Sequence, residues 1–155
     1  MKIALGADHA GFVAKEEIRT VLKAMGHEAV DVGTTSEISC DYPDFAAVAA
    51  RKVASGECER GVLICGTGIG MSIAANKVAG IRAALIHDEK TAEISRSHND
   101  ANVFCAGARF MPVIKIAESL KIWLQTPFLG GRHSKRVEKI SGIERESRSA
   151  DDGLI

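Results

Sequence analysis

The run Cys65-Gly66-Thr67-Gly68-Ile69-Gly70 contains the residue types best suited to chemistry. Its cysteine ends an apolar segment, and three alternating glycines follow. Glycines at this spacing let several backbone N–H groups turn inward at the start of a helix and bind a negatively charged oxygen. A thiol at the positive end of a helix has its thiolate favoured, and a thiolate acts as a base or a nucleophile. The run therefore predicts an anion-binding loop beside a reactive thiol, leading into a helix over 73–77.

Two other interpretations of the glycine run remain open. The first is a tight turn between a strand and a helix, in which glycine serves only to allow a positive φ. The second is a dinucleotide site, because Asp88 lies about 20 residues further on, where such sites carry an acidic residue. The G-x-G-x-x-G pattern of those sites requires glycine at the position of Met71. The residues thus favour an anion cradle.

Asp8 and His9 follow another apolar segment and place a carboxylate beside an imidazole. Ligands of parallel sheets bind where strands end, so both side chains are candidates for a binding site. Asp is also a favoured N-cap residue, and Asp8 is equally compatible with capping the first helix. The two interpretations do not exclude each other.

A second polar cluster begins at His98 and continues through Asn99 and Asp100. It precedes an apolar segment, and Arg109 follows that segment. A histidine at the end of a helical stretch can simply complement the helix dipole. The number of polar side chains before a buried strand indicates a binding role instead.

Arg132 and Arg136 stand four residues apart after two glycines. At the start of a helix they face the same way, and guanidinium forks suit a phosphate dianion. Simple exposure to solvent is the ordinary alternative. In a chain with 20 Lys+Arg against 20 Asp+Glu, this local cluster is the best candidate for a phosphate contact.

The elements that must position these residues follow from an alternation of apolar segments and helical patterns. The expected strands are Lys2–Ala7, Glu28–Val32, Gly61–Cys65, Ile81–Ile86 and Asn102–Ala106. Pro43 and Pro112 mark helix starts, and Pro127 marks a helix end. The alternation predicts an α/β fold with right-handed crossovers: a three-layer α/β/α domain with a five-stranded parallel sheet, Rossmann-like.

The composition limits the classes of function. With 155 residues and a formal net charge of zero, we expect one domain over residues 1–140 that binds no nucleic acid. The N-terminal segment is too short and polar for a signal peptide or membrane span, so a cytoplasmic protein without a membrane partner is expected. The four cysteines include no C-x-x-C pair, which favours reduced thiols and disfavours a metal site. Residues 141–155 are polar and predict an exposed or partner-seeking extension.

Taken together, these motifs closely resemble type B ribose-5-phosphate isomerase, in the family that also contains galactose-6-phosphate and allose-6-phosphate isomerases. The resemblance covers roughly residues 1–140, in the order of the family. It rests on Gly6-Ala7-Asp8-His9-Ala10-Gly11, Asp41-Tyr42-Pro43-Asp44-Phe45, the run from Ile64 to Ala84, His98-Asn99-Asp100-Ala101-Asn102-Val103 and Gly130-Gly131-Arg132-His133.

The resemblance implies an aldose–ketose isomerase of the pentose phosphate pathway that interconverts D-ribose 5-phosphate and D-ribulose 5-phosphate through a cis-enediolate, without a cofactor. Cys65 matches the family's catalytic base, and His98 matches the acid that helps to open the sugar ring. The other implied site residues are Asp8 and Thr67 for ring opening and hydroxyl contacts, Gly66, Gly68, Ile69 and Gly70 in the binding loop, Asn99 for the open-chain sugar, and His9, Arg109, Arg132 and Arg136 for the phosphate. The family donates part of the phosphate set across a dimer interface, so a homodimer or dimer of dimers with shared active sites is expected.

The chemistry of the residues agrees with these roles. Moving a proton beside a carbonyl requires a base poised near neutral pH and fixed donors at the developing oxyanion. No His/carboxylate cluster has the spacing of metal ligands, which disfavours a metal-assisted hydride shift. One branch of the family uses a glutamate that would fall at Met71, so this chain is similar to the cysteine branch. We expect the sulfur of Cys65 to lie close to both Asp8 and His98.

Two alternatives to this function stay open. The substrate could be another sugar phosphate, such as allose 6-phosphate, galactose 6-phosphate or a tetrose phosphate, since the sequence does not fix the length of the pocket. A non-catalytic nucleotide-binding domain is the alternative from another class, and Asp88 is the residue that favours it.

Overall fold

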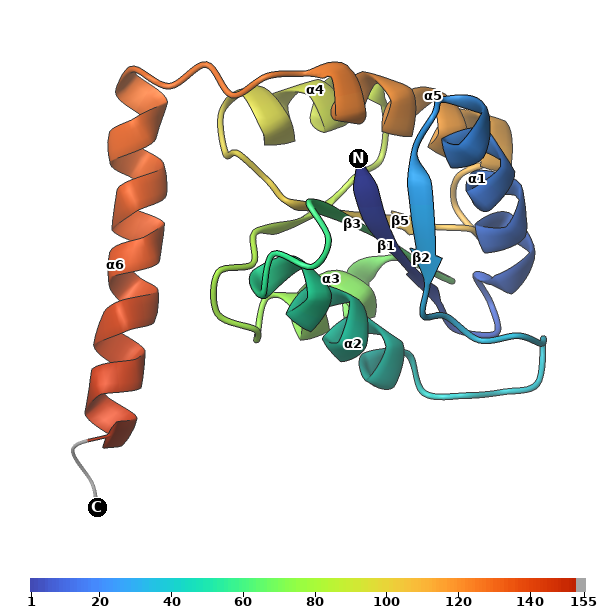
Figure 1. Cartoon of the computed structure of the whole chain (residues 1–155), viewed down its shortest axis with the longest axis horizontal. Coiled ribbons are helices and arrows are strands. Elements are labelled where there is room, and N and C mark those ends of the chain that lie inside the picture. The colour runs from blue at the N-terminus through green and yellow to red at the C-terminus, as the bar shows by residue number, and fades with distance from the viewer. Residues whose placement is uncertain (153–155) are drawn as a thin grey trace.

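The computed structural model describes the backbone of residues 1–152 and the side chains of residues 1–149. A five-stranded parallel sheet forms its centre (Figure 1). The strands are β1 (Lys2–Ala7), β2 (Glu28–Asp31), β3 (Arg60–Cys65), β4 (Ala83–Leu85) and β5 (Val103–Gly107), in the spatial order β2-β1-β3-β5-β4. The helices are α1 (Phe12–Ala24), α2 (Tyr42–Ala54), α3 (Ile69–Ala75), α4 (Glu89–Ser97), α5 (Val113–Gln125) and α6 (Arg132–Asp152). The predicted α/β fold is confirmed.

Helices cover both faces of the sheet, which explains why the central strands are apolar throughout. Figure 1 shows α1, α4 and α5 on one face and α2 and α3 on the other. The first face packs a cluster that includes Ile18, Ile116 and Trp123, and the second packs an alanine-rich cluster around α2. The helices on the two faces and the sheet between them form the three layers predicted from the alternation of elements (Figure 1).

The strand ends differ from the prediction by one residue in most cases and by more at β4. The expected strand Ile81–Ile86 is reduced to Ala83–Leu85. Its first residues bond to side chains instead of the ladder: the N–H of Arg82 donates to Asn102 Oδ1 at 2.8 Å, and that of Ala83 donates to Asn76 Oδ1 at 2.9 Å. Hydropathy could not reveal this competition, because the segment is apolar either way.

The helix boundaries follow the prolines. Pro43 is the second residue of α2, Pro112 immediately precedes α5, and Pro127 follows its end. Asp88 caps α4: its carboxylate accepts the N–H of Thr91 at 2.6 Å, and the Thr91 hydroxyl accepts the N–H of Asp88 at 3.1 Å. This capping box accounts for Asp88 without a nucleotide.

The strand order places a crevice between the ends of β1 and β3. From β1 the chain crosses to β2 on one side, and from β3 it crosses to the strands on the other side. The loops that leave these two neighbouring strands therefore diverge at the carboxyl edge of the sheet. Such a switch point is where parallel sheets bind their ligands. Asp8 follows β1 and Cys65 ends β3, so both lie at this crevice.

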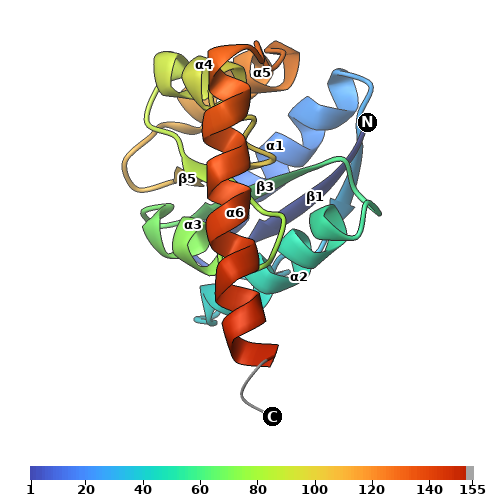
Figure 2. The ribbon, with the colours of Figure 1, turned by 90° about the vertical axis from the view of Figure 1, so that its left-hand side faces the viewer.

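Helix α6 stands beside the domain and covers neither face of the sheet (Figures 1 and 2). It continues through residue 140 without a break, so residues 141–152 of the predicted extension are helical, while 153–155 lie outside the described residues. The carboxylate of Glu144 anchors α6 by accepting the N–H of Gly80 at 2.9 Å. The division into a domain and an extension at residue 140 stays a prediction. Within residues 1–152, no helix has both the length and the apolar character of a membrane span.

Gly11 lets the loop after β1 approach β3 closely. A Cβ at this position would lie 2.2 Å from the carbonyl oxygen of Ile64. We expect Gly11→Ala to destabilise the fold by about 1–3 kcal/mol, because backbone must move to relieve the overlap. Urea unfolding measures this change in the free energy of unfolding.

Gly142→Ala is the matched control for this substitution. In α6 the nearest atom to an added Cβ is Arg145 Nη2 at 3.9 Å. Alanine should be neutral or slightly stabilising there, because it is the better helix former. Equal effects of the two substitutions would contradict the steric argument.

Candidate active site

The sulfur of Cys65 accepts a hydrogen bond from the backbone N–H of Gly68 at 3.1 Å. Cys65 is the last residue of β3, and its side chain is 4% exposed. Gly68 has a φ of +75° and is the N-cap of α3. The sulfur therefore lies at the N-terminal end of α3. The glycine loop thus directs one N–H at the sulfur, and its binding of an anion stays a prediction.

Gly68 is required both by its conformation and by the space around it. Its positive φ disfavours any L side chain, and an added Cβ would lie 2.6 Å from Leu85 Cδ1 and 2.8 Å from the carbonyl carbon of Ala106. The interpretation of the glycine run as a tight turn that needs a positive φ is therefore correct at Gly68. The turn that glycine permits is what directs the N–H toward the sulfur.

Helix α3 begins earlier than the sequence indicated. It spans Ile69–Ala75, whereas the expected helix covered 73–77. Gly70 therefore lies inside the helix, a position that glycine disfavours on propensity alone. The early start brings Ile69 and Gly70 to the crevice, and both line it.

The carboxylate of Asp8 shapes the loop after β1. Its Oδ1 accepts the N–H groups of Ala10 at 3.0 Å and Gly11 at 3.1 Å. The expectation that Asp8 caps the first helix is wrong, because α1 begins at Phe12 with Gly11 as N-cap and without a side-chain cap. Both bonds use Oδ1. Oδ2 makes no hydrogen bond to the described residues, and Asp8 lines the crevice, so this oxygen is available to a ligand.

His9 is held by the loop between β2 and α2. Its Nδ1 lies 3.2 Å from both the backbone N and the carbonyl oxygen of Cys40. The peptide of Cys40 can donate to a neutral Nδ1 or accept from a protonated one. Either contact occupies Nδ1 and leaves Nε2 for a ligand.

Arg109 reaches the same place from the end of β5. Its backbone N–H donates to Gly66 O at 3.0 Å, and its side chain lies 3.2 Å from where a Cβ on Gly66 would be. The loop after β3 and the loop after β5 are therefore fixed to each other. A guanidinium across such a loop supplies positive charge for an anion.

These residues surround one cavity of about 380 Å³ at the carboxyl edge of the sheet. It brings together Asp8, His9, Cys65, Gly66, Thr67, Ile69, Gly70 and Arg109 from the predicted set. It also contains Ala10, Tyr42 and Ile73, which the prediction did not include as site residues. Pro43 marks the start of a helix and so indicated where Tyr42 lies in the chain. The sequence did not show that this helix starts beside the cavity.

Four of the predicted site residues do not line this cavity: His98, Asn99, Arg132 and Arg136. His98 ends α4 and precedes β5, whose first residue Val103 pairs with Gly61 at the start of β3. Cys65 pairs with Gly107 at the other end, four residues further along. At about 3.3 Å per residue, the two edges are roughly 13 Å apart. The expectation that one chain brings Cys65 close to His98 is wrong, because α4 returns antiparallel to the strands.

His98 belongs to a second, cationic group. Its ring stacks on His133 of α6, with centroids 4.1 Å apart and an interplanar angle of 11°. His133 is 6% exposed, and its burial lowers the pKa, as do the charges of His98, Arg132 and Arg136. The second group therefore gathers positive charge around the start of α6. The two arginines lie one helical turn apart, as predicted.

The protein-family model described as Ribose/Galactose Isomerase matches residues 3–140 of the chain. The chain belongs to this family. Ribose-5-phosphate isomerase B of Escherichia coli is 47% identical over 93% of this chain and 97% of its own. D-erythrulose-4-phosphate isomerase of Pectobacterium atrosepticum is 40% identical, over 96% and 98%. The structure of ribose-5-phosphate isomerase B from Clostridium thermocellum superimposes with a TM-score of 0.94 at 49% identity, covering 95% of this chain and 99% of that one.

Membership of the ribose/galactose isomerase family makes the protein an isomerase. The likeness reaches into α6, since the family model extends to residue 140 and the Clostridium structure covers 95% of the chain. Both groups of predicted residues therefore lie within the shared fold.

The lowered pKa of His133 has a consequence for stability. Unfolding restores the ordinary histidine pKa of about 6.5, so below that pH the unfolded chain binds a proton that the folded chain still rejects. Stability should therefore fall as the pH drops from about 6.5 through the lowered value. His133→Asn should flatten this decline, as measured by urea unfolding between pH 5 and 8.

His87→Asn is the control, because that imidazole is exposed. It should leave the slope of stability against pH unchanged. An equally steep decline in His133→Asn and the wild type would exclude His133 as its source.

Proposed function

We propose that the protein interconverts D-ribose 5-phosphate and D-ribulose 5-phosphate, with Cys65 as the base. The observation that carries this proposal is the N–H of Gly68 directed at a sulfur that lines the cavity with Asp8 and His9. A thiolate held in this way can remove a proton from carbon without attacking the phosphate. Ribose-5-phosphate isomerase B from Escherichia coli and Clostridium thermocellum supports the choice of a five-carbon substrate.

The reaction proceeds on the open-chain sugar. The thiolate of Cys65 takes the proton from C2 of the aldose, and the electrons of that C–H bond form the C1=C2 bond of a cis-enediolate. Backbone N–H groups in the loop after β3 stabilise the developing oxyanion. The thiol then returns the proton to C1, while the proton of the C2 hydroxyl passes to the oxygen on C1. This gives the ketose, and no net electron leaves the substrate.

The phosphate requires positive charge around the cavity. Arg109 supplies it from the carboxyl edge of the sheet, where Nε2 of His9 adds a hydrogen-bonding group. The pair Arg132 and Arg136 can supply more only from another chain. Arginine is suited to this role because its fork donates two hydrogen bonds to one phosphate.

A second copy of the chain completes the site in this proposal. Its His98 acts as the acid that opens the furanose ring, and its Asn99 contacts the open-chain sugar. Helix α6 provides the means of assembly, because a groove of about 680 Å³ separates it from the loop before β4 within one chain. A helix that covers no face of its own domain gains most of its stability from packing on a partner.

Cys65→Ala tests the base. The rate of isomerisation of ribose 5-phosphate should fall by about 10²–10⁴-fold, the usual contribution of a general base, with little change in binding of the sugar phosphate. Allose 6-phosphate, galactose 6-phosphate and erythrulose 4-phosphate should be assayed beside it, since relatives are named for other sugars. Faster turnover of one of these would change the substrate but not the base.

Cys58→Ala is the matched control for the thiol. Cys58 is 1% exposed and packs in the same core cluster as Cys65, but it does not line the cavity. Its removal should leave the rate unchanged. Full activity of Cys65→Ala would refute the proposed role.

Mixing two inactive variants tests the shared site. A pair of chains carrying Cys65→Ala and His98→Asn has one site in which both residues are intact. Random exchange of subunits in a dimer should therefore restore about a quarter of the wild-type rate. A coupled assay after mixing, with sedimentation to measure the oligomer, gives the result; no recovery would place both residues in one chain's site.

A further inference from the structure

Asp100 is the one non-glycine residue with a positive φ, 47°, among those that the structure describes. It directly follows His98 and Asn99, at the turn between α4 and β5. A left-handed conformation is unfavourable for an L residue and persists only where its surroundings hold it. The contacts that hold Asp100 therefore decide the path of this turn.

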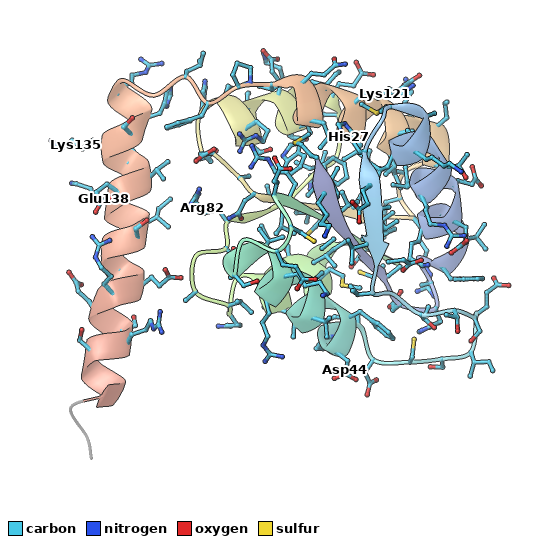
Figure 3. The ribbon with its side chains drawn as sticks, viewed as in Figure 1. His27, Asp44, Arg82, Lys121, Lys135 and Glu138 are labelled. Atoms are coloured by element: carbon cyan, nitrogen blue, oxygen red, sulfur yellow. The ribbon has the colours of Figure 1, made fainter. Side chains whose placement is uncertain are left out.

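Two arginines hold Asp100 from opposite sides. Arg96, which is 4% exposed, donates from Nη1 to Asp100 Oδ1 at 2.8 Å and to the carbonyl of Ala101 at 2.7 Å. Arg82, labelled in Figure 3 and immediately before β4, donates from Nη2 to Asp100 Oδ2 at 3.1 Å and to its carbonyl at 2.9 Å. Its Nε lies 3.1 Å from the carbonyl of Asn99. Both carboxylate oxygens and three successive carbonyls are thus fixed.

The arginines are themselves immobilised. The guanidinium of Arg96 lies 5.7 Å from the ring centre of Trp123, which is fully buried. The backbone of Arg82 is bonded to Asn102 at 2.8 Å, and Asn102 donates in turn to Gly80 at 2.8 Å. The clamp of Arg82, Asp100 and Arg96 therefore connects the turn to the core and to the loop before β4.

We propose that Asp100 is a positioning residue that sets the direction of His98 and Asn99 for the reaction. The N–H of His98 is bonded to Ile94 at 2.9 Å in the last turn of α4, and the N–H of Asp100 is bonded to Arg96 at 3.1 Å. The dipeptide between them is held at both ends. This inference rests on the proposed function, in which His98 and Asn99 contact the sugar of a second copy.

The proposal separates two reactions at the site. Opening the furanose ring of ribose 5-phosphate needs the aligned acid, His98. Ribulose 5-phosphate is already an open chain, because its C5 oxygen carries the phosphate. Exchange of its C1 hydrogen with solvent through the enediolate uses the base at the other edge of the sheet and requires no acid for ring opening. Misalignment of His98 should therefore slow ring opening and spare the exchange.

Asp100→Asn and Asp100→Gly test this separation. Asparagine tolerates the left-handed conformation but lacks the charge, and glycine adopts it without strain but lacks both contacts. We expect isomerisation of ribose 5-phosphate to fall about 10- to 100-fold in Asp100→Gly, and less in Asp100→Asn, in keeping with the cost of small misplacements. Deuterium uptake at C1 of ribulose 5-phosphate in D₂O, followed by NMR, should stay close to the wild-type rate.

Glu118→Gln is the matched control, because it removes an exposed carboxylate paired with Lys115 at 2.6 Å on α5. It should change neither rate. Wild-type isomerisation in both Asp100 variants, or equal loss of isomerisation and deuterium uptake, would overturn the positioning role while leaving the proposed function intact. Failure of the wild-type protein to isomerise ribose 5-phosphate would overturn the proposed function, and this inference with it.

Discussion

The parallel direction of all five strands determines where the chemistry of this protein can lie. Each loop that follows a strand is at one edge of the sheet, and each loop that follows a helix is at the other. Asp8, Cys65 and Arg109 belong to the first class, and His98 and Arg132 to the second. This division follows from the parallel pairing of every neighbouring pair of strands, because the chain must return to the same edge before each new strand. A site that uses both classes must therefore join two chains.

The second constraint is the contact between Cys65 and the N–H of Gly68. Cys105 lies on the neighbouring strand, two residues before Gly107, which pairs with Cys65, and is fully buried. Burial raises the pKa of the Cys105 thiol far above its ordinary range, and a negative charge on Cys65 would raise it further. Two cysteines in adjacent apolar strands thus differ in their surroundings because of two residues of register and one N–H group.

The arginines of this chain, whose net charge is zero, differ in their exposure and in their ion pairs. Arg96 and Arg82 are used internally, where each holds the carboxylate of Asp100. Arg109, Arg132 and Arg136 form no ion pair with the residues described, and all three are exposed. The first pair builds the turn that carries His98, and the exposed set remains available for a phosphate. Net charge alone gave no indication of this division.

The sequence by itself determined the elements, their parallel arrangement and the chemical identity of the residues at the strand ends. Apolar segments, prolines and glycines act locally, so β1, the starts of α2 and α5 and the Cys65 loop could be predicted. Competition between side chain and backbone at Arg82, the early start of α3 and the role of Asp8 in its loop could not, because each depends on atoms distant in the chain or on a φ that residue type does not fix. The predicted parallel sheet already implied opposite edges for Cys65 and His98, because Cys65 ends a strand and His98 precedes one. Tertiary structure alone decided that the loops after β1, β3 and β5 line one cavity, because the order of the strands in the sheet is a property of the folded topology that local residue types do not fix.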